Sequence, residues 1–186
     1  MNKIIAIVGM CGSGKSIASD YYEKQGFEKI YFGGVTLDKL KEKGLEINPD
    51  NEKMMRESLR DKYGMGAFAY LLLEKIEKKV KISNVVLDGL YSWDEYVILK
   101  EKFGDRLKLV CVCCDKAIRY ERIGRRVDRP FNLEEIQIRD LSEIENLAKG
   151  GPIAFADYYI FNNGNIESYE KRLLEILTDI DKQLGR

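Results

Sequence analysis

One stretch near the N-terminus constrains the fold more than any other. Residues 9–16 read GMCGSGKS and directly follow residues 4–8, an apolar run rich in β-branched side chains. A short run of this kind is typical of a strand that is buried on both faces of a parallel sheet. A glycine-rich turn after such a strand predicts either an ordinary strand-to-helix connection or a loop that binds phosphates.

The spacing within this stretch favours phosphate binding. It fits the P-loop pattern G-x-x-x-x-G-K-[ST], with Gly9 first and Ser16 last. Glycines let several backbone N–H groups converge on one anion, and the N-terminus of the next helix adds partial positive charge. The Lys15 ammonium can reach the β- and γ-phosphates, and the Ser16 hydroxyl can bind Mg²⁺. We therefore expect ATP and Mg²⁺ as ligands, with the nucleotide bound by Gly9, Cys11, Gly12, Ser13, Gly14, Lys15, Ser16 and Ile17.

Strand-like and helix-like segments alternate along the rest of the chain. Apolar runs predict further strands at residues 27–34, 84–89, 106–114 and 156–164. Helical patterns lie between them, at residues 14–24, 37–79, 92–103, 117–126, 132–149 and 166–184, with the second interrupted at 43–51 and at 62–67. This alternation predicts βαβ units and an α/β fold, with a parallel sheet that helices cover on both faces.

Composition excludes several classes of function. Lysine plus arginine equals aspartate plus glutamate at 31 each, so the chain lacks the basic excess of a general duplex-binding protein. The absence of histidine excludes a histidine-based triad and a histidine zinc site. The run at 4–8 is too short for a signal peptide, and no stretch approaches a membrane span. We therefore expect a cytoplasmic protein without a stable nucleic-acid or membrane partner, with Cys11, Cys111, Cys113 and Cys114 as buried free thiols.

A carboxylate ends one of the predicted strands. Asp88 closes the run VVLDG, at the carboxyl end of a strand, where ligands bind in open α/β sheets. We expect Asp88 to hold Mg²⁺, directly or through water, or to orient an attacking hydroxyl. The alternative is that Asp88 caps the turn or helix that follows.

Two groups of arginines could neutralise phosphate charge. The segment IRYERIGRRVDR holds five arginines, of which Arg119, Arg122 and Arg126 share one helical face. A lid that closes over phosphates would have this character, although exposed surface is the alternative. In the second group, Arg56 and Arg60 lie one helical turn apart. They could hold the phosphate of an acceptor, or form ion pairs with neighbouring acidic residues such as Glu57 and Asp61.

Together these motifs resemble the P-loop nucleoside-monophosphate-kinase group, in particular dephospho-CoA kinase and its adenylate-kinase-related archaeal relatives. The resemblance is carried by GMCGSGKS, LRDKYGMGAFA, VVLDG, RYERIGRR and ADYYIFNNG, which are spread over nearly the whole chain. It implies a single three-layer P-loop kinase domain over residues 1–186, with a five-stranded parallel sheet in the order 2-3-1-4-5. The core would comprise residues 1–34, 81–118 and 150–186, with a helical acceptor-binding insert at about 35–80 and a lid at about 119–149.

The resemblance also implies transfer of the γ-phosphate of ATP to a small acceptor. The residues that it places in catalysis are Lys15, Asp88, Arg122 and Arg126. Those at the nucleotide base are Asn162, Asn163 and Gly164, with Arg122 also contacting the nucleotide. Those on the acceptor side are Gly33, Arg56, Arg60 and Tyr91.

The sequence departs from the family pattern at two places, both on the acceptor side. Relatives often carry DGxR, with an arginine that contacts the acceptor phosphate, whereas Tyr91 stands at that position here. The segment GGVTLDKL also lacks the aspartate-rich signature of dephospho-CoA kinases. Three functions therefore stay open: a kinase for a nucleoside monophosphate or related nucleotide, a dephospho-CoA kinase, and a nucleotide-dependent switch with slow hydrolysis. The choice between ATP and GTP, and the oligomeric state, also stay open.

Overall fold

The strands pair in the order β2-β3-β1-β4-β5 in the computed structural model, which describes residues 1–126 and 130–185. Every neighbouring pair runs parallel, so the predicted α/β class and strand order are confirmed. In register, Ile7 of the central strand lies between Asp88 and Val110. The strands are β1 (Ile4–Val8), β2 (Glu28–Tyr31), β3 (Val85–Asp88), β4 (Leu107–Cys113) and β5 (Tyr158–Phe161).

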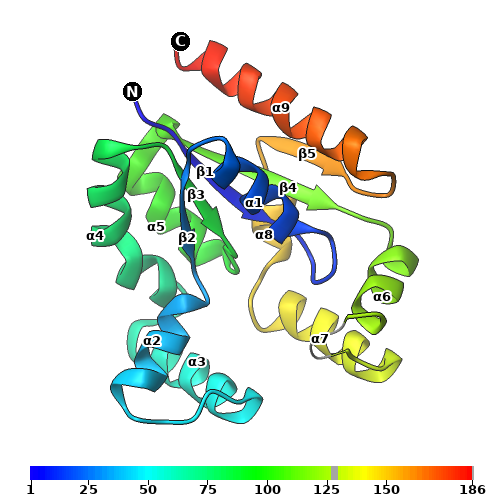
Figure 1. The fold of residues 1–186 in the computed structure, drawn as a ribbon. Coiled ribbons are helices and arrows are strands. Elements are labelled where there is room, and N and C mark those ends of the chain that lie inside the picture. Colours follow the sequence, from blue (N-terminus) through cyan, green and yellow to red (C-terminus); the bar gives the residue numbers. More distant parts are fainter. Residues whose placement is uncertain (127–129, 186) are drawn as a thin grey trace.

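Helices connect the strands and cover the sheet (Figure 1). They are α1 (Lys15–Lys24), α2 (Gly34–Glu42), α3 (Pro49–Tyr63), α4 (Ala67–Ile82), α5 (Trp93–Phe103), α6 (Lys116–Gly124), α7 (Leu133–Glu145), α8 (Gly150–Ala154) and α9 (Ile166–Gln183), with a short 3₁₀ turn at Gly104–Arg106. The two predicted breaks within 37–79 are confirmed, since the stretch forms the three helices α2, α3 and α4. Pro49 begins the second because it cannot continue an earlier helix, and the Asn48 side chain caps it by accepting from the Asn51 N–H at 2.9 Å.

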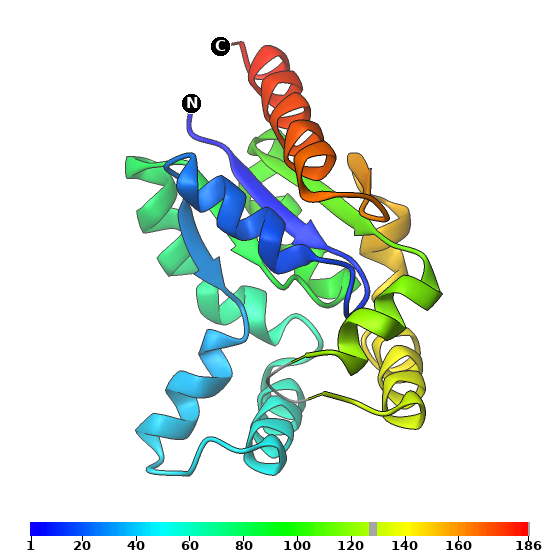
Figure 2. The same ribbon diagram turned by 45° about the vertical axis from the view of Figure 1, so that its right-hand side comes forward.

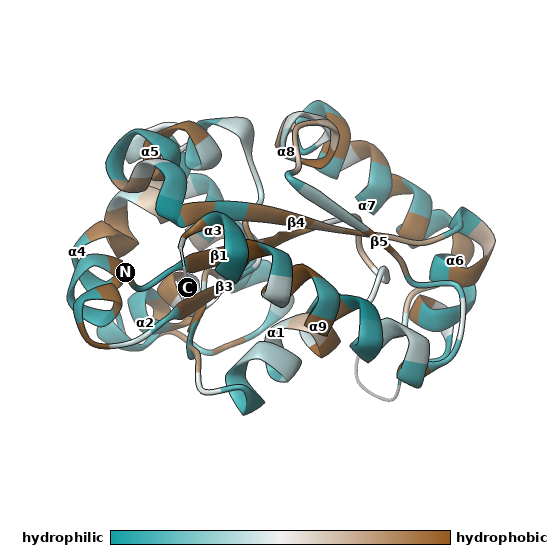
Figure 3. Ribbon diagram, turned by 90° about the horizontal axis from the view of Figure 1, so that it is seen from above, coloured by the Kyte–Doolittle hydropathy of each residue, from teal (hydrophilic) through white to brown (hydrophobic). Residues whose placement is uncertain are grey.

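Alternate side chains of β1 enter two separate cores. Ile4, Ala6 and Val8 pack with α4 and α5, whereas Ile5 and Ile7 pack with α1 and α9. Figure 3 shows the same three layers from above, with α4 and α5 on one side of the sheet and α1 and α9 on the other. The predicted stripe of α9 is buried at Tyr169, Leu173, Ile176 and Ile180.

Two pairs of helices stand at the carboxyl ends of the strands. Figures 1 and 2 show α2 and α3 at one side of this end of the molecule and α6 and α7 at the other. The loop 9–14, which joins β1 to α1, lies at the same end. The fold thus brings the phosphate-binding motif and both arginine groups to one edge of the sheet. Within the described part of the chain, no helix has the length and apolarity to cross a membrane.

Candidate functional site

The loop 9–14 has a backbone that only glycine suits at three positions, Gly9, Gly12 and Gly14. Gly9 has a φ of 145° and Gly14 a φ of 100°, in a region that other residues rarely adopt. There is also no room for a side chain at these positions. A Cβ on Gly9 would collide with the carbonyl oxygen of Val112 in β4, and a Cβ on Gly14 would collide with the side-chain amide of Asn162. The P-loop spacing therefore corresponds to a real conformational requirement.

Contacts from the C-terminal part of the chain hold this loop in shape. Asn162 Nδ2 donates to the Ser13 carbonyl at 2.9 Å, and the Tyr169 hydroxyl donates to the Gly14 carbonyl at 3.1 Å. The Ser13 hydroxyl is buried and forms no hydrogen bond with any residue that the structure describes. The loop is thus already shaped and retains a polar group for a ligand.

Lys15 folds back over the loop. Its Nζ donates to the Met10 carbonyl at 3.0 Å, so the ammonium lies along the phosphate-binding turn rather than in the core. Burial first, and then the charge of the nearby Lys149 ammonium, lower the pKa of Lys15 to about 8. An incoming phosphate would relieve both effects because it supplies negative charge.

The two predicted Mg²⁺ ligands are linked through a residue that the sequence did not single out. The Ser19 hydroxyl lies 2.9 Å from the Ser16 carbonyl and 3.0 Å from Asp88 Oδ2, one turn along α1. Lys29 Nζ lies 3.7 Å from the same Asp88 oxygen. Ser16 itself is exposed at the start of α1. This set of hydroxyl and carboxylate oxygens suits Mg²⁺, which prefers oxygen ligands and usually keeps several waters.

The three arginines on the predicted helical face differ in their surroundings. Arg119 is buried and forms a paired contact with Asp140 of α7, with N–O distances of 3.0 and 2.7 Å. It also donates to the Cys11 carbonyl at 2.8 Å. These contacts explain Arg119 as the residue that fastens α6 to α7 and to the loop.

Arg122 and Arg126 have only sulfur partners among the described residues. Arg122 Nη1 lies 3.4 Å from Cys114 Sγ, and Arg126 Nη2 lies 3.7 Å from Cys11 Sγ. The Arg126 guanidinium thus contacts the P-loop, the Arg122 guanidinium contacts the residue that follows β4, and neither has a carboxylate of the described chain beside it. Arg129 and the rest of 127–129, within the predicted lid, lie outside the described residues.

Cys11 joins the loop to the segment that follows β4. Its N–H donates to Glu143 Oε2 at 3.2 Å, in addition to the contacts that its carbonyl and sulfur make with arginines. Glu143 Oε2 also lies 2.9 Å from Lys149 Nζ, and Glu143 Oε1 lies 3.5 Å from Arg139 Nε. Charged partners hold the pKa of Glu143 below its ordinary value, Lys149 first among them. Neither Glu143 nor Lys149 was singled out from the sequence, since each reads as helix surface.

Two of the four predicted acceptor residues, Arg60 and Tyr91, lie near a second buried carboxylate, Glu95. Glu95 accepts from the Tyr91 and Ser92 N–H groups at 2.7 and 3.2 Å, as the capping residue of α5. Burial raises its pKa to about 7, although the Arg60 guanidinium acts in the opposite direction. Arg60 Nε is buried without a hydrogen-bond partner among the described residues, and the guanidinium lies 5.2 Å from the centroid of the Phe68 ring.

The other two acceptor candidates lie farther out. Arg56 forms an i, i+4 ion pair with Glu52 at 3.5 Å, rather than with Glu57 or Asp61. Gly33 precedes α2 and is covered by the ring of Tyr31, which a Cβ at this position would meet.

Tyr91 lies between the loop and the acceptor residues. Its ring centroid is 5.1 Å from Lys149 Nζ, a cation–π contact. Burial raises the pKa of its hydroxyl, and the charges of Asp88 and Glu95 act in the same direction. A cationic side chain from another part of the chain thus lies beside the position where relatives often carry an arginine.

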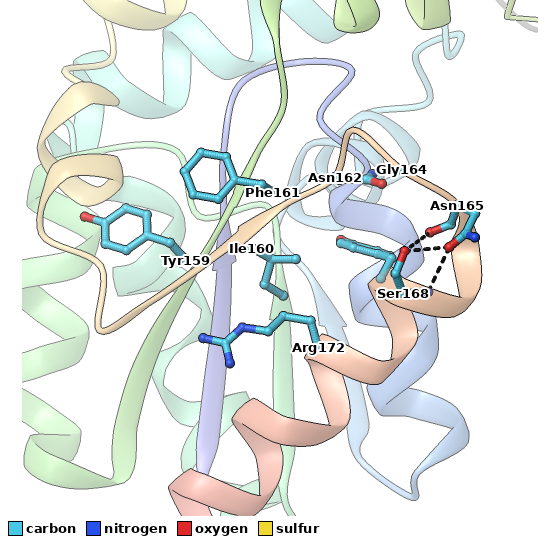
Figure 4. A pocket seen from close by; sticks show the side chains of 9 residues that line it. Tyr159, Ile160, Phe161, Asn162, Gly164, Asn165, Ser168 and Arg172 are labelled. Carbon is cyan, nitrogen blue, oxygen red and sulfur yellow. Dashed lines mark hydrogen bonds between the residues drawn. The ribbon is translucent and has the colours of Figure 1, made fainter.

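The predicted base residues lie beside a cavity of about 220 Å³ between β5 and the start of α9 (Figure 4). Asn162 and Gly164 line it, together with Tyr159, Phe161, Ser168 and Arg172. Asn163 instead accepts from the Asp115 N–H at 2.9 Å. A second cavity of about 180 Å³ adjoins the loop and is lined in part by Gly9, Ser13 and Cys111.

All four cysteines are free thiols; Cys11 and Cys111 are buried as expected, whereas Cys113 and Cys114, at the end of β4, are half-buried.

Comparison with known proteins gives the family and the fold. The AAA domain family matches residues 5–144. A UPF0200 protein from Thermococcus kodakarensis is 34% identical, covering 97% of this chain and 100% of that protein. A gluconokinase from Sinorhizobium meliloti has a TM-score of 0.63 at 16% identity, covering 98% of this chain and 95% of its own. A dephospho-CoA kinase from Campylobacter jejuni has a TM-score of 0.55 at 15% identity, covering 97% and 98%. These structural matches confirm the predicted P-loop kinase fold.

Proposed function

The chain belongs to the AAA domain family and to the UPF0200 proteins, and on that premise we propose that it is a kinase that transfers the γ-phosphate of ATP to a nucleoside monophosphate or a related nucleotide. The observation that carries the proposal is the shaped loop 9–14 with Lys15 folded against it. A turn that merely reversed the chain would need neither a buried unpartnered serine hydroxyl nor a partly buried lysine.

The donor half of the proposal uses groups that converge on the loop. Lys15 exchanges the Met10 carbonyl for phosphate oxygens, and the loop N–H groups bind the same phosphates. Ser16 and Asp88 would hold Mg²⁺, which when bound neutralises charge on the transferred phosphoryl group. Ser19 and Lys29 keep the Asp88 carboxylate in place for this role. Arg122 and Arg126 lie close enough to the loop to stabilise charge that develops during transfer.

The acceptor half depends on Arg60. Its guanidinium is half-buried at the same edge of the sheet, and one donor has no partner in the described chain. Because a buried donor without a partner is costly, this group suits an anionic ligand better than a purely structural role. Asp88, at the end of β3, is the carboxylate available to orient the acceptor oxygen.

The test is release of nucleoside diphosphate from ATP and from GTP with Mg²⁺ and a panel of acceptors. The panel contains ribo- and deoxyribonucleoside monophosphates and dephospho-CoA, with Lys15→Ala as the blank and Lys24→Ala, an exposed lysine on the same helix, as the matched control. We expect one monophosphate to accelerate turnover far above the rate without acceptor. In Lys15→Ala this accelerated turnover should be abolished.

Other outcomes distinguish the alternatives. Acceleration by dephospho-CoA alone would overturn the monophosphate assignment in favour of that kinase activity. Tight nucleotide binding with no response to any acceptor would favour a nucleotide-dependent switch. Full activity in Lys15→Ala would contradict the phosphate-binding role of the loop.

A further inference from the structure

More positive than negative charge gathers beside the P-loop. Lys15, Lys149 and Arg139 all act on Glu143, which is the carboxylate between them. Asp88 also acts on Lys15, but it is already paired with Lys29 at 3.7 Å. Glu143 alone cannot neutralise three cations, and the other nearby carboxylates, Asp88 and Glu95, also face Lys29 and Arg60, so positive charge is in excess at this site.

Lys149 is the least expected member of this group. Its side chain is only 1% exposed, although lysine is rarely buried unless it is paired. Among the described residues, its charged partner is a single oxygen, Glu143 Oε2 at 2.9 Å, and the Tyr91 ring covers another side. An ammonium carries three N–H donors, so Lys149 retains donors for a further acceptor without losing Glu143.

Lys149 lies between the two halves of the proposed site. Its charge lowers the pKa of Lys15 on the donor side and that of Glu95 on the acceptor side, where Arg60 also acts. Tyr91, under the ammonium, donates its backbone N–H to the same Glu95. The Lys149 Nζ is buried over the Tyr91 ring and forms no hydrogen bond with any residue that the structure describes.

We propose that Lys149 is an anion-binding residue of the acceptor half, where its ammonium holds the phosphate of the acceptor beside Lys15 while Glu143 keeps it in position. This inference rests on the proposed kinase function and adds a residue to it. Glu143 is fixed independently by the Cys11 N–H and by Arg139, so it can position Lys149 while a ligand phosphate takes the remaining donors. The ligand phosphate would also offset the excess positive charge.

The experiment measures acceptor binding while the donor site is filled. Each protein is saturated with Mg²⁺ and the non-hydrolysable ATP analogue AMP-PNP, and then titrated in a calorimeter with inorganic phosphate and, separately, with AMP. The informative variant is Lys149→Met/Glu143→Gln, which removes both charges of the buried pair and leaves no bare carboxylate. Glu143→Gln alone shows how much of the change comes from the carboxylate.

We expect the double variant to bind phosphate and AMP at least about tenfold more weakly than Glu143→Gln, as loss of a charge-assisted hydrogen bond would produce. AMP-PNP affinity should change much less. Lys149→Arg, which keeps the positive charge in a larger side chain, should bind both probes more tightly than the double variant. Lys78→Met, at an exposed lysine of α4, is the matched control.

Equal affinity for phosphate and AMP in the double variant and in Glu143→Gln would overturn the inference. So would a wild-type protein that binds AMP-PNP but neither of the two probes. Failure of the wild type to bind AMP-PNP would instead contradict the proposed function itself, so the two failures can be told apart.

Discussion

The side-chain amide of Asn162 lies so close to the Cα of Gly14 that any side chain at position 14 would overlap it. The same amide donates to the Ser13 carbonyl at 2.9 Å. The end of β5 therefore shapes the loop at the end of β1, although 149 residues separate the hydrogen-bonded pair in the sequence. The residue at position 162 therefore limits which residue can stand at position 14, and the reverse also holds.

Replacing Gly14 with alanine should abolish nucleotide binding. The added methyl group meets Asn162, and alanine at a φ of 100° is strained, which together should lower the free energy of unfolding by about 1–3 kcal/mol. Titration with a fluorescent ATP analogue and urea unfolding measure the two effects. Asn162→Ala in the same chain removes the overlap but not the strain, so it should restore binding only in part. Wild-type affinity in Gly14→Ala would contradict this account of the loop.

Nucleotide binding should be coupled to proton uptake by Lys15. Its pKa of about 8 in the free protein means that much of the population is neutral above pH 8, whereas phosphate binding requires the ammonium. Affinity for ATP should therefore fall as the pH rises above 8, by up to about tenfold per unit. Calorimetry at pH 8.5 in buffers with different ionisation enthalpies measures the proton directly. In Lys15→Arg the uptake should vanish, and an unchanged uptake would assign it to another group.

Breaking the Arg119–Asp140 pair should destabilise the fold. The two side chains are 7% and 12% exposed, so Asp140→Asn leaves a buried guanidinium without its charge partner and should cost about 3 kcal/mol of unfolding free energy. Urea unfolding measures this loss. Arg125→Ala is the matched control, since that arginine is 79% exposed and its pair with Glu121 should be worth under about 1 kcal/mol. A similar loss in both variants would refute the structural role given to Asp140.

Arg122 and Arg126 should affect turnover rather than stability. Neither has a carboxylate partner among the described residues, so replacing either with alanine removes charge near the phosphates without exposing a buried ion. The expected effect is a fall in kcat of about 10²-fold or more with an unfolding free energy within about 0.5 kcal/mol of wild type. Steady-state kinetics with the acceptor found in the panel provides the readout. Unchanged kinetics would mean that the arginine is an ordinary surface residue without a role in phosphoryl transfer.

Stability should decline with pH because of Glu95. Its pKa in the folded protein is raised to about 7 from an ordinary value of 4.5, so the folded state holds a proton that the unfolded chain has lost. The contribution is fully present below about pH 4.5 and is lost as the pH rises to about 7, with a slope of at most about 1.4 kcal/mol per unit. Urea unfolding at pH 5 and 7.5 tests this. Glu95→Gln should remove the decline, whereas Glu101→Gln, at an exposed position of α5, should keep it.

The parts of the molecule that sequence predicts best are those that depend on residues close together in the chain. The run at 4–8 is apolar throughout because β1 is buried on both faces, and residues 9–16 contain the whole P-loop spacing. Helical periodicity also located α9. The glycine- and proline-containing segments at 43–51 and 62–67 also marked the two breaks between α2, α3 and α4, whereas nothing in the sequence located α8, whose GGP start resembles a turn.

The chemistry that sequence missed depends on contacts between distant segments. Ser19 bonds to Asp88 69 positions away, and Glu143 bonds to Cys11 132 positions away. No local spacing in the sequence predicts such pairs, and Lys149 resembles an ordinary exposed lysine at the end of a helical pattern. The arginines at 119, 122 and 126 show the same limit. The helical face predicted for them does not reveal that Arg119 pairs with Asp140, and it is wrong for Arg126, because α6 ends at Gly124. The roles given to Arg122, Arg126, Arg60 and the base residues stay predictions.

The contacts that Cys11 makes with Glu143, Arg119 and Arg126 also determine how freely the residue at position 11 can vary. Two of its three polar contacts, to Glu143 and to Arg119, are made by the peptide N–H and C=O. The side chain contacts Arg126 and packs in a small apolar cluster with Ile123 and Ile136. Exchange of the cysteine for another small residue would leave the main-chain contacts intact. Position 11 can therefore drift in evolution while the attachment of α6 and α7 to the loop persists, and variation there would be a poor guide to loss of function.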